Sequence, residues 1–141
     1  MLEGISPNIA YSAQHTGDPL DAYLRSLRLV RDLPVALVLP GHGAPFSDLT
    51  GRVDALEQHH EERLQAILDV VAKQEGQSAY AIASQLPWRG SAGGWQQLQP
   101  FDRLAALSET LAHVQYLTNQ GRLHRREEDG TVVVSVRRAE R

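Results

Sequence analysis

The sequence predicts a mainly α-helical fold with a small β hairpin, and three observations support this. Apolar residues recur at three- and four-residue intervals in several long segments, the pattern of a helix with one buried face. Proline and glycine residues stand at the ends of these segments, where they begin or stop a helix. Near the C-terminus, two short segments flank residues 127–130, whose Asp129-Gly130 pair favours a tight hairpin turn.

The N-terminal part predicts one helix and one buried strand. Asp18 is a suitable helix cap, and Pro19 fits the first helical position because its missing N–H would have no partner there. Pro34 ends this helix. Residues 35–39 are apolar at every position, the pattern of a short strand that is covered on both faces. Such a strand needs neighbours that the first 50 residues do not supply, so residues 1–50 are predicted to be a piece of a larger domain.

The remainder predicts three helices and the hairpin. A long helix is expected over residues 48–74, a short one after Ser78, and a third over residues 101–119. Three helices followed by a two-stranded hairpin are the order of a winged-helix domain. We therefore assign residues 51–141 to a long connecting helix and a winged-helix domain.

Bulk properties exclude several classes of protein. The 141 residues contain no cysteine, which excludes disulfides and thiolate zinc sites. A net charge of −3 argues against a surface built entirely for nucleic acid or for an anionic membrane. No apolar run approaches the ~20 residues of a membrane span, and the N-terminus lacks the features of a signal peptide. We expect a cytoplasmic protein with no membrane partner.

The segment Leu39-Pro40-Gly41-His42-Gly43 is the most informative one for chemistry. A histidine between two glycines, directly after a strand, has an open approach for a ligand. Metal ligands and catalytic bases are often presented in this way. Histidines flanked by glycine also occur in ordinary turns, so the segment alone leaves both interpretations open.

A resemblance to a known family covers nearly the whole chain. Residues 17–27 together with residues 37–43 resemble the closing portion of metallo-β-lactamase-fold hydrolases, whose fold is an αββα sandwich. His59-x-x-x-Arg63 and the segment around His113 resemble the winged-helix extension of a subgroup similar to glyoxalase II and β-lactamase-like protein 2. The sequence thus resembles a winged-helix domain preceded by a fragment of that sandwich.

The resemblance implies that His42 is one ligand of a di-metal site that holds two zinc ions in the intact parent. The other ligands, a His-x-His-x-Asp-His cluster among them, are implied to lie in a missing N-terminal half, and none is present in this sequence. A metal-activated water needs at least three protein ligands. We therefore expect no zinc and no activity in this chain by itself. In the parent, the substrate is expected to be a small ester, a thioester or RNA.

The same resemblance implies that the extension borders the substrate, with Trp88, Arg125 and Arg126 as candidate contacts. An alternative stays open, a free-standing winged-helix module that binds nucleic acid or protein. Against duplex DNA, the helix over residues 101–119 offers little basic charge, and carboxylates crowd the hairpin tip. The uncovered strand over residues 35–39 also predicts that this region is either disordered or covered by a second copy of the chain, through swapping or strand pairing.

The remaining histidines are predicted to be structural. His59 and His60 are adjacent, and neighbouring residues on a helix point about 100° apart, so the pair cannot clamp one ion. We expect them to pack or to hydrogen-bond near the junction of the two parts. His15 and His113 are expected to be structural or solvent-facing.

Overall fold

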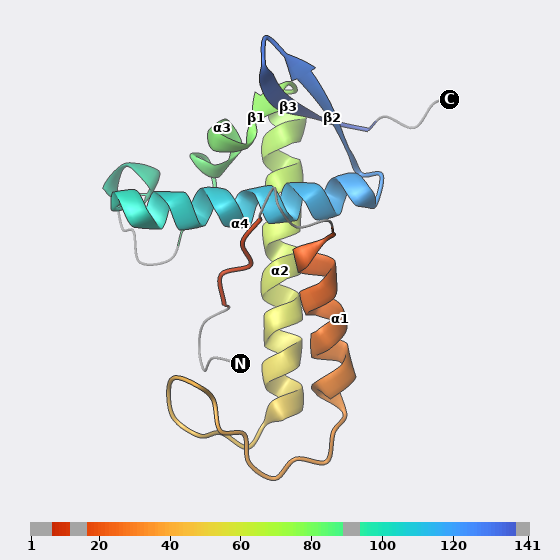
Figure 1. Ribbon diagram of the computed structural model, residues 1–141, viewed down its shortest axis with the longest axis vertical. Coiled ribbons are helices and arrows are strands. Elements are labelled where there is room, and N and C mark those ends of the chain that lie inside the picture. Colours follow the sequence, from red (N-terminus) through yellow and green to blue (C-terminus); the bar gives the residue numbers. More distant parts are fainter. Residues whose placement is uncertain (1–6, 12–16, 89–93, 138–141) are drawn as a thin grey trace.

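The computed structural model describes residues 7–11, 17–88 and 94–137. Two helices lie side by side as a hairpin, a third long helix crosses the second one, and a small sheet lies beyond the crossing (Figure 1). The elements are α1 (Pro19–Arg31), α2 (Leu49–Lys73), β1 (Gln77–Ser78), α3 (Ala79–Ala83), the 3-10 helix η1 (Gly94–Gln97), α4 (Pro100–Asn119), β2 (Leu123–Glu128) and β3 (Thr131–Val136). The fold is therefore mainly helical, as the sequence predicts.

The predicted starts of the two hairpin helices are confirmed. The Asp18 carboxylate accepts a hydrogen bond from the Asp21 N–H at 3.0 Å, and Pro19 occupies the first turn of α1. The Asp48 carboxylate accepts from the Gly51 N–H at 2.8 Å at the start of α2. Each carboxylate satisfies an N–H group that has no partner inside its own helix.

The C-terminal hairpin is confirmed, with a tighter turn than residues 127–130. Glu127 and Glu128 belong to β2, so Asp129 and Gly130 alone make the turn. Both have positive φ angles, 49° and 75°, as a two-residue hairpin turn requires. A third strand, β1, was not predicted. It pairs antiparallel with β3 and gives the sheet order β1-β3-β2.

One continuous core joins the helices to the sheet. Its fully buried side chains include Leu20 of α1, Leu56 and Ile67 of α2, Leu117 of α4 and Leu123 of β2. These residues come from both sides of the predicted boundary at residue 50. The division into domains, and the winged-helix assignment with it, stays a prediction.

The helical spacing of apolar residues predicts that Tyr80 of the short helix lies inside and that one face of the last helix is buried. That face contains Leu104, Leu107, Leu111, Val114 and Leu117. The prediction is partly wrong. Leu104 is 64% exposed, and Tyr80 of the short helix, also expected inside, is 55% exposed. Val114 and Leu117 are buried as predicted, and the buried face also contains Thr110 and His113, which were not expected there. In Figure 1 the first turns of α4 extend past α2, so α2 does not cover them, and a second small cluster of Ala83, Trp95 and Ala106 covers only one side of this end of α4. Among the residues that the structure describes, no helix has the length and hydropathy needed to cross a membrane.

Candidate functional site

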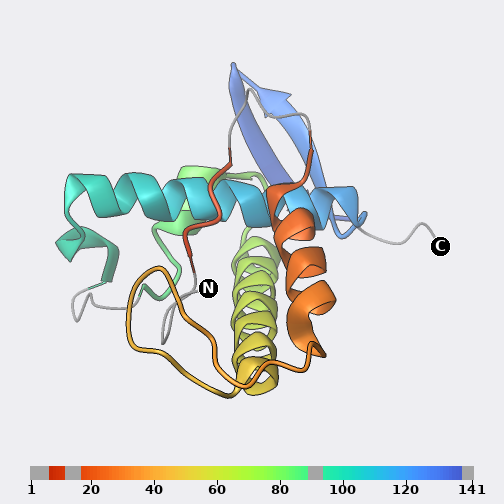
Figure 2. The same cartoon turned by 60° about the horizontal axis from the view of Figure 1, so that its bottom comes forward.

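The predicted metal ligand, His42, lies in the long loop between α1 and α2, at the end of the helical hairpin (Figure 2). The loop contains one isolated bridge, in which Val38 and Phe46 exchange backbone hydrogen bonds of 2.7 and 3.1 Å. The expected buried strand over residues 35–39 is therefore wrong for this chain. A strand needs partners along its length, and within the described residues this segment pairs with Phe46 alone.

The apolar side chains of this segment face solvent. Val35 is 39% exposed, Leu37 55% and Leu39 75%. Leu29 and Leu33, which precede them, are also exposed. Five large apolar side chains close together in the sequence thus lack cover, and we call them the apolar loop surface.

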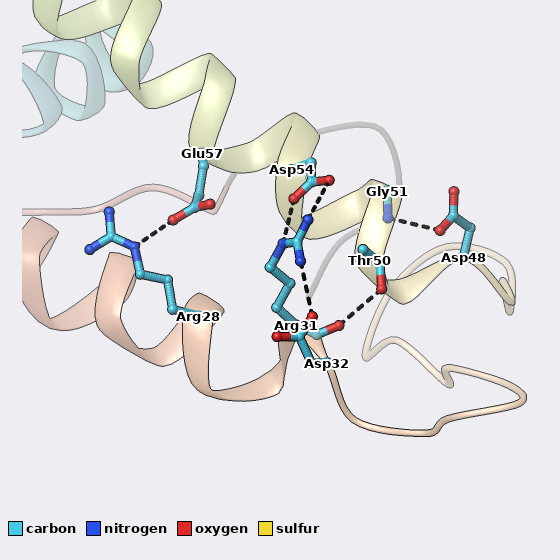
Figure 3. Close-up of polar contacts among 8 residues, drawn as sticks. All are labelled: Arg28, Arg31, Asp32, Asp48, Thr50, Gly51, Asp54 and Glu57. Carbon is cyan, nitrogen blue, oxygen red and sulfur yellow. Dashed lines mark hydrogen bonds and ion pairs between the residues drawn. The ribbon is translucent and has the colours of Figure 1, made fainter.

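Polar contacts hold the two ends of the loop together (Figure 3). The Arg31 guanidinium donates two hydrogen bonds to the Asp54 carboxylate, from Nε at 2.7 Å and from Nη2 at 3.0 Å. The Thr50 hydroxyl donates to the Arg31 carbonyl at 3.0 Å. One turn further on, Arg28 Nε lies 2.7 Å from Glu57. These contacts fix the last turns of α1 on the first turns of α2, and so they fix the base of the loop.

The paired charges at this base shift each other's titration. The hydrogen bond to Asp54 raises the pKa of Arg31, and the hydrogen bond from Arg31 lowers the pKa of Asp54. Both side chains are exposed, so the pair is screened and serves orientation more than stability.

His42 is exposed and stands between Gly41 and Gly43, and the φ angle of Gly43 is 89°. Its imidazole is open to a partner, as a metal ligand must be. The described residues do not complete a metal site, however, because no three His, Asp or Glu side chains among them are placed to hold an ion. The residues present therefore do not fit a di-zinc centre by themselves.

A second polar cluster, which we call the junction cluster, lies where α4 crosses α2. His60 and His113 are 1% and 0% exposed, and their rings stack with centroids 5.2 Å apart. His60 Nδ1 lies 3.0 Å from His113 Nε2, and His113 Nδ1 lies 2.8 Å from the Glu109 carbonyl. The predicted hydrogen-bonding role of His60 is confirmed, and His113 is structural. Their contact joins α2 to α4, both within residues 51–141, so the predicted junction of the two parts stays a prediction.

Arg63 completes the junction cluster and is also nearly buried. Its Nη1 donates to the Pro87 carbonyl at 2.9 Å, and its guanidinium lies over the Trp88 ring, 4.3 Å from the centroid. Its Nε lies 3.7 Å from the Glu109 carboxylate. Trp88 is held from its other side, since its Nε1 donates to the Ala83 carbonyl at 2.8 Å. This buried role of Arg63, in contact with Pro87, Trp88 and Glu109, was not predicted from the sequence.

A hollow of about 240 Å³ lies beside this arginine, lined by His59, Glu62, Arg63, Ala66, Pro87 and Trp88. The predicted substrate-side residue Trp88 thus lines a recess on the flank of α2. Since the ring is fixed by Arg63 and Ala83, its place at the edge of the recess is well defined.

The other two substrate-side candidates lie elsewhere. Arg125 and Arg126 are on β2, and the sheet is at the opposite end of α2 from the loop that carries His42 (Figure 1). The Arg125 guanidinium donates to Gln115 at 2.8 Å, and Arg126 lies 2.6 Å from Glu128. The structure does not bring these arginines and His42 together. His15 lies outside the described residues.

The junction cluster was not predicted, although the periodicity of the long helix indicates that His60 is buried. His60 falls on the same stripe as Leu56 and Leu64, both fully buried. A polar side chain on an apolar stripe needs a buried partner. His113 sits next to Val114 in the last helix in the same way, but the sequence does not reveal that the two histidines meet.

Among known proteins, several solved structures are similar to this chain. No family model matches the sequence, and no curated protein does. A metallo-beta-lactamase family protein from Thermus thermophilus superposes with a TM-score of 0.77 at 30% identity, covering 96% of this chain and 39% of its own. A beta-lactamase domain protein from Burkholderia ambifaria gives 0.79 at 29% identity, covering 94% and 38%. The chain is thus similar over nearly its whole length to metallo-beta-lactamase family proteins, and it spans less than two fifths of theirs.

Proposed function

We propose that this chain is the C-terminal part of a metal-dependent hydrolase of the metallo-β-lactamase superfamily. In this proposal it supplies His42 as one metal ligand and a winged-helix domain on the substrate side. The observation that carries the proposal is the asymmetry of coverage, since almost all of this chain matches less than two fifths of each relative. The catalytic metal would then be held mostly by residues that this sequence does not contain.

The exposure of the apolar loop surface supports the same proposal. Five large apolar side chains are exposed between residues 29 and 39, and exposed apolar side chains in such number usually mark a contact with another protein surface. The surface includes the segment just before His42, so the part of the hydrolase that covers it would also lie next to the imidazole. A partner seated there would supply the missing ligands and exclude water from the loop.

The proposal predicts different behaviour for this chain and for a longer one. Purified by itself, the chain should bind no stoichiometric zinc, and metal analysis by mass spectrometry should show the same for His42→Ala. The longest reading frame that contains this sequence should encode a His-x-His-x-Asp-His cluster upstream. Its product should bind about two zinc ions per chain and hydrolyse a thioester, ester or phosphodiester substrate.

The matched pair of variants in that longer protein is His42→Ala and His124→Ala. Both remove an exposed histidine, but His124 lies on β2, at the opposite end of α2. His42→Ala should lose at least one zinc ion per chain and most of the activity, whereas His124→Ala should keep both. Full zinc content in the His42→Ala protein would refute the proposed ligand, and a reading frame without the upstream cluster would refute the hydrolase.

A further inference from the structure

The buried His60–His113 pair lies where three helices meet. His60 belongs to α2 and His113 to α4, and the ring of Tyr23 from α1 packs edge-on against His60 with centroids 5.5 Å apart. The same three helices share one buried apolar core, with Leu24 from α1, Leu64 from α2 and Leu117 from α4. The crossing of α4 over the helical hairpin thus contains two titratable groups that water does not reach.

The hydrogen bonds fix the protonation state of both rings. A carbonyl oxygen only accepts, so His113 Nδ1 carries the hydrogen that it donates to the Glu109 carbonyl. In a neutral ring His113 Nε2 is then an acceptor, and His60 Nδ1 must donate to it. One additional proton leaves this bond possible, because a charged His60 still donates. With two additional protons, N–H faces N–H across 3.0 Å and the bond is lost.

The charged groups around the pair oppose a positive charge more than they favour it. On α2, His59 and Arg63 are close to His60, and the His59 and His60 ring centroids are 5.2 Å apart. On α4, the Glu109 carboxylate faces Arg63, with 3.7 Å between Arg63 Nε and the carboxylate. From α1 the neighbour is the neutral phenol of Tyr23. Burial, and secondly the charge of neighbouring groups, lowers the pKa of His60 to about 3, and burial lowers the pKa of His113 to about 4.

We propose that the His60–His113 pair is a proton-operated latch between α2 and α4. While both rings are neutral, the latch holds α4, and with it the β hairpin, against the α1–α2 hairpin. When each ring takes up one proton, the hydrogen bond between the rings is lost and α4 is released from the α1–α2 hairpin. The latch rests on the geometry of the crossing and is independent of the proposed hydrolase activity.

Linkage between protonation and opening sets the expected size of the effect. Between about pH 6.5, the pKa of a free imidazole, and the lowered values in the closed state, opening takes up protons. The closed state therefore loses stability as the pH falls. Each proton taken up makes the opening equilibrium constant rise about tenfold per pH unit, so the two histidines together give about 100-fold.

Amide hydrogen exchange of residues 110–117 tests the latch between about pH 6.5 and pH 5. After correction for the intrinsic exchange rate, the opening constant of these α4 amides should rise roughly 250-fold over this range, with a slope that approaches 100-fold per pH unit at its acid end. Amides 22–29 in the middle of α1 should show a smaller rise, because they belong to the half that stays together. A pH-independent opening constant for α4 would overturn the latch.

Two substitutions remove the titration but keep a donor and an acceptor for the hydrogen bond between positions 60 and 113. In His60→Asn the amide N–H replaces Nδ1–H, and in His113→Gln the amide oxygen replaces Nε2. Each single variant should reduce the dependence to about tenfold per pH unit, and the double variant should abolish it. His124→Gln, an exposed control on β2, should keep the wild-type dependence. A wild-type dependence in the double variant would contradict the proposal.

Imidazole ¹⁵N chemical shifts of the wild-type protein provide a test that needs no variant. At about pH 5.5, where a free imidazole is mostly charged, both rings should be neutral with the hydrogen on Nδ1. Two charged rings in a protein whose α4 amides remain protected would refute the latch.

Discussion

Replacing Arg63 with methionine should destabilise the protein by about 3 kcal/mol. The guanidinium donates to a carbonyl at 2.9 Å and covers the Trp88 ring at 4.3 Å. A hydrogen bond from a charged group contributes about 1.5–3 kcal/mol, and a desolvated cation–π contact about 2 kcal/mol. Methionine keeps much of the apolar packing of the arginine stem, which offsets part of the loss.

Urea unfolding followed by tryptophan fluorescence measures this loss. With a slope of about 2 kcal/mol per molar urea, the midpoint should fall by about 1.5 M. Arg25→Met is the matched control, because Arg25 forms an exposed pair with Asp21 and its removal should leave the midpoint nearly unchanged. Equal midpoints for the two variants would refute the view that Arg63 anchors the junction cluster.

A second substitution tests whether Glu109 is the charged partner of Arg63. Burial raises the pKa of Glu109, and the nearby Arg63 opposes this effect. Without the arginine, the carboxylate is left buried with less compensation, which is costly. Glu109→Gln should therefore be better tolerated in the Arg63→Met background than in the wild type, and a double-mutant cycle should give a coupling above about 0.5 kcal/mol. Additive effects would show that the two side chains do not interact.

Three further predictions concern the core, the hairpin turn and the end of α2. Leu20→Ala, at a fully buried position, should cost about 2–5 kcal/mol in thermal unfolding, whereas Leu29→Ala, 80% exposed, should change little. Gly130→Ala should cost about 1–2 kcal/mol because the φ angle of 75° disfavours a Cβ atom, and an unchanged melting temperature would argue against this turn. Gln77→Leu should cost about 1–3 kcal/mol in urea unfolding, since the Gln77 amide donates to the Val70 and Gln74 carbonyls that end α2. Gln97→Leu, at an exposed position, is its control.

The long helices could be predicted because their signals are local. Asp18, Pro19 and Asp48 mark helix starts within a few residues, and Gly130 marks a turn by its own backbone preference. β1 has no such signal. It is two residues long, and it exists because β3, which follows much later in the sequence, lies beside it.

The candidate site also has a part that the sequence predicts and a part that it does not. His42 is recognisable in its short segment, because the glycines and the preceding apolar run are contiguous. The junction cluster joins His60 to His113, 53 residues apart, and its chemistry comes from a crossing that periodicity does not reveal. The apolar run before His42 is the opposite case, because its local pattern predicts a strand that does not form. Among the described residues it pairs with Phe46 alone, and it remains a loop.

The length of α2 sets the distance between the His42 loop and the sheet. This helix runs for 25 residues without interruption, which corresponds to a length of about 37 Å. One of its ends carries the His42 loop and the other carries the sheet with Arg126. A small ester or thioester can reach one of these ends only, while an extended strand of RNA can touch both. Under the function proposed above, a ligand that touches both His42 and Arg126 therefore has to span about the length of this helix.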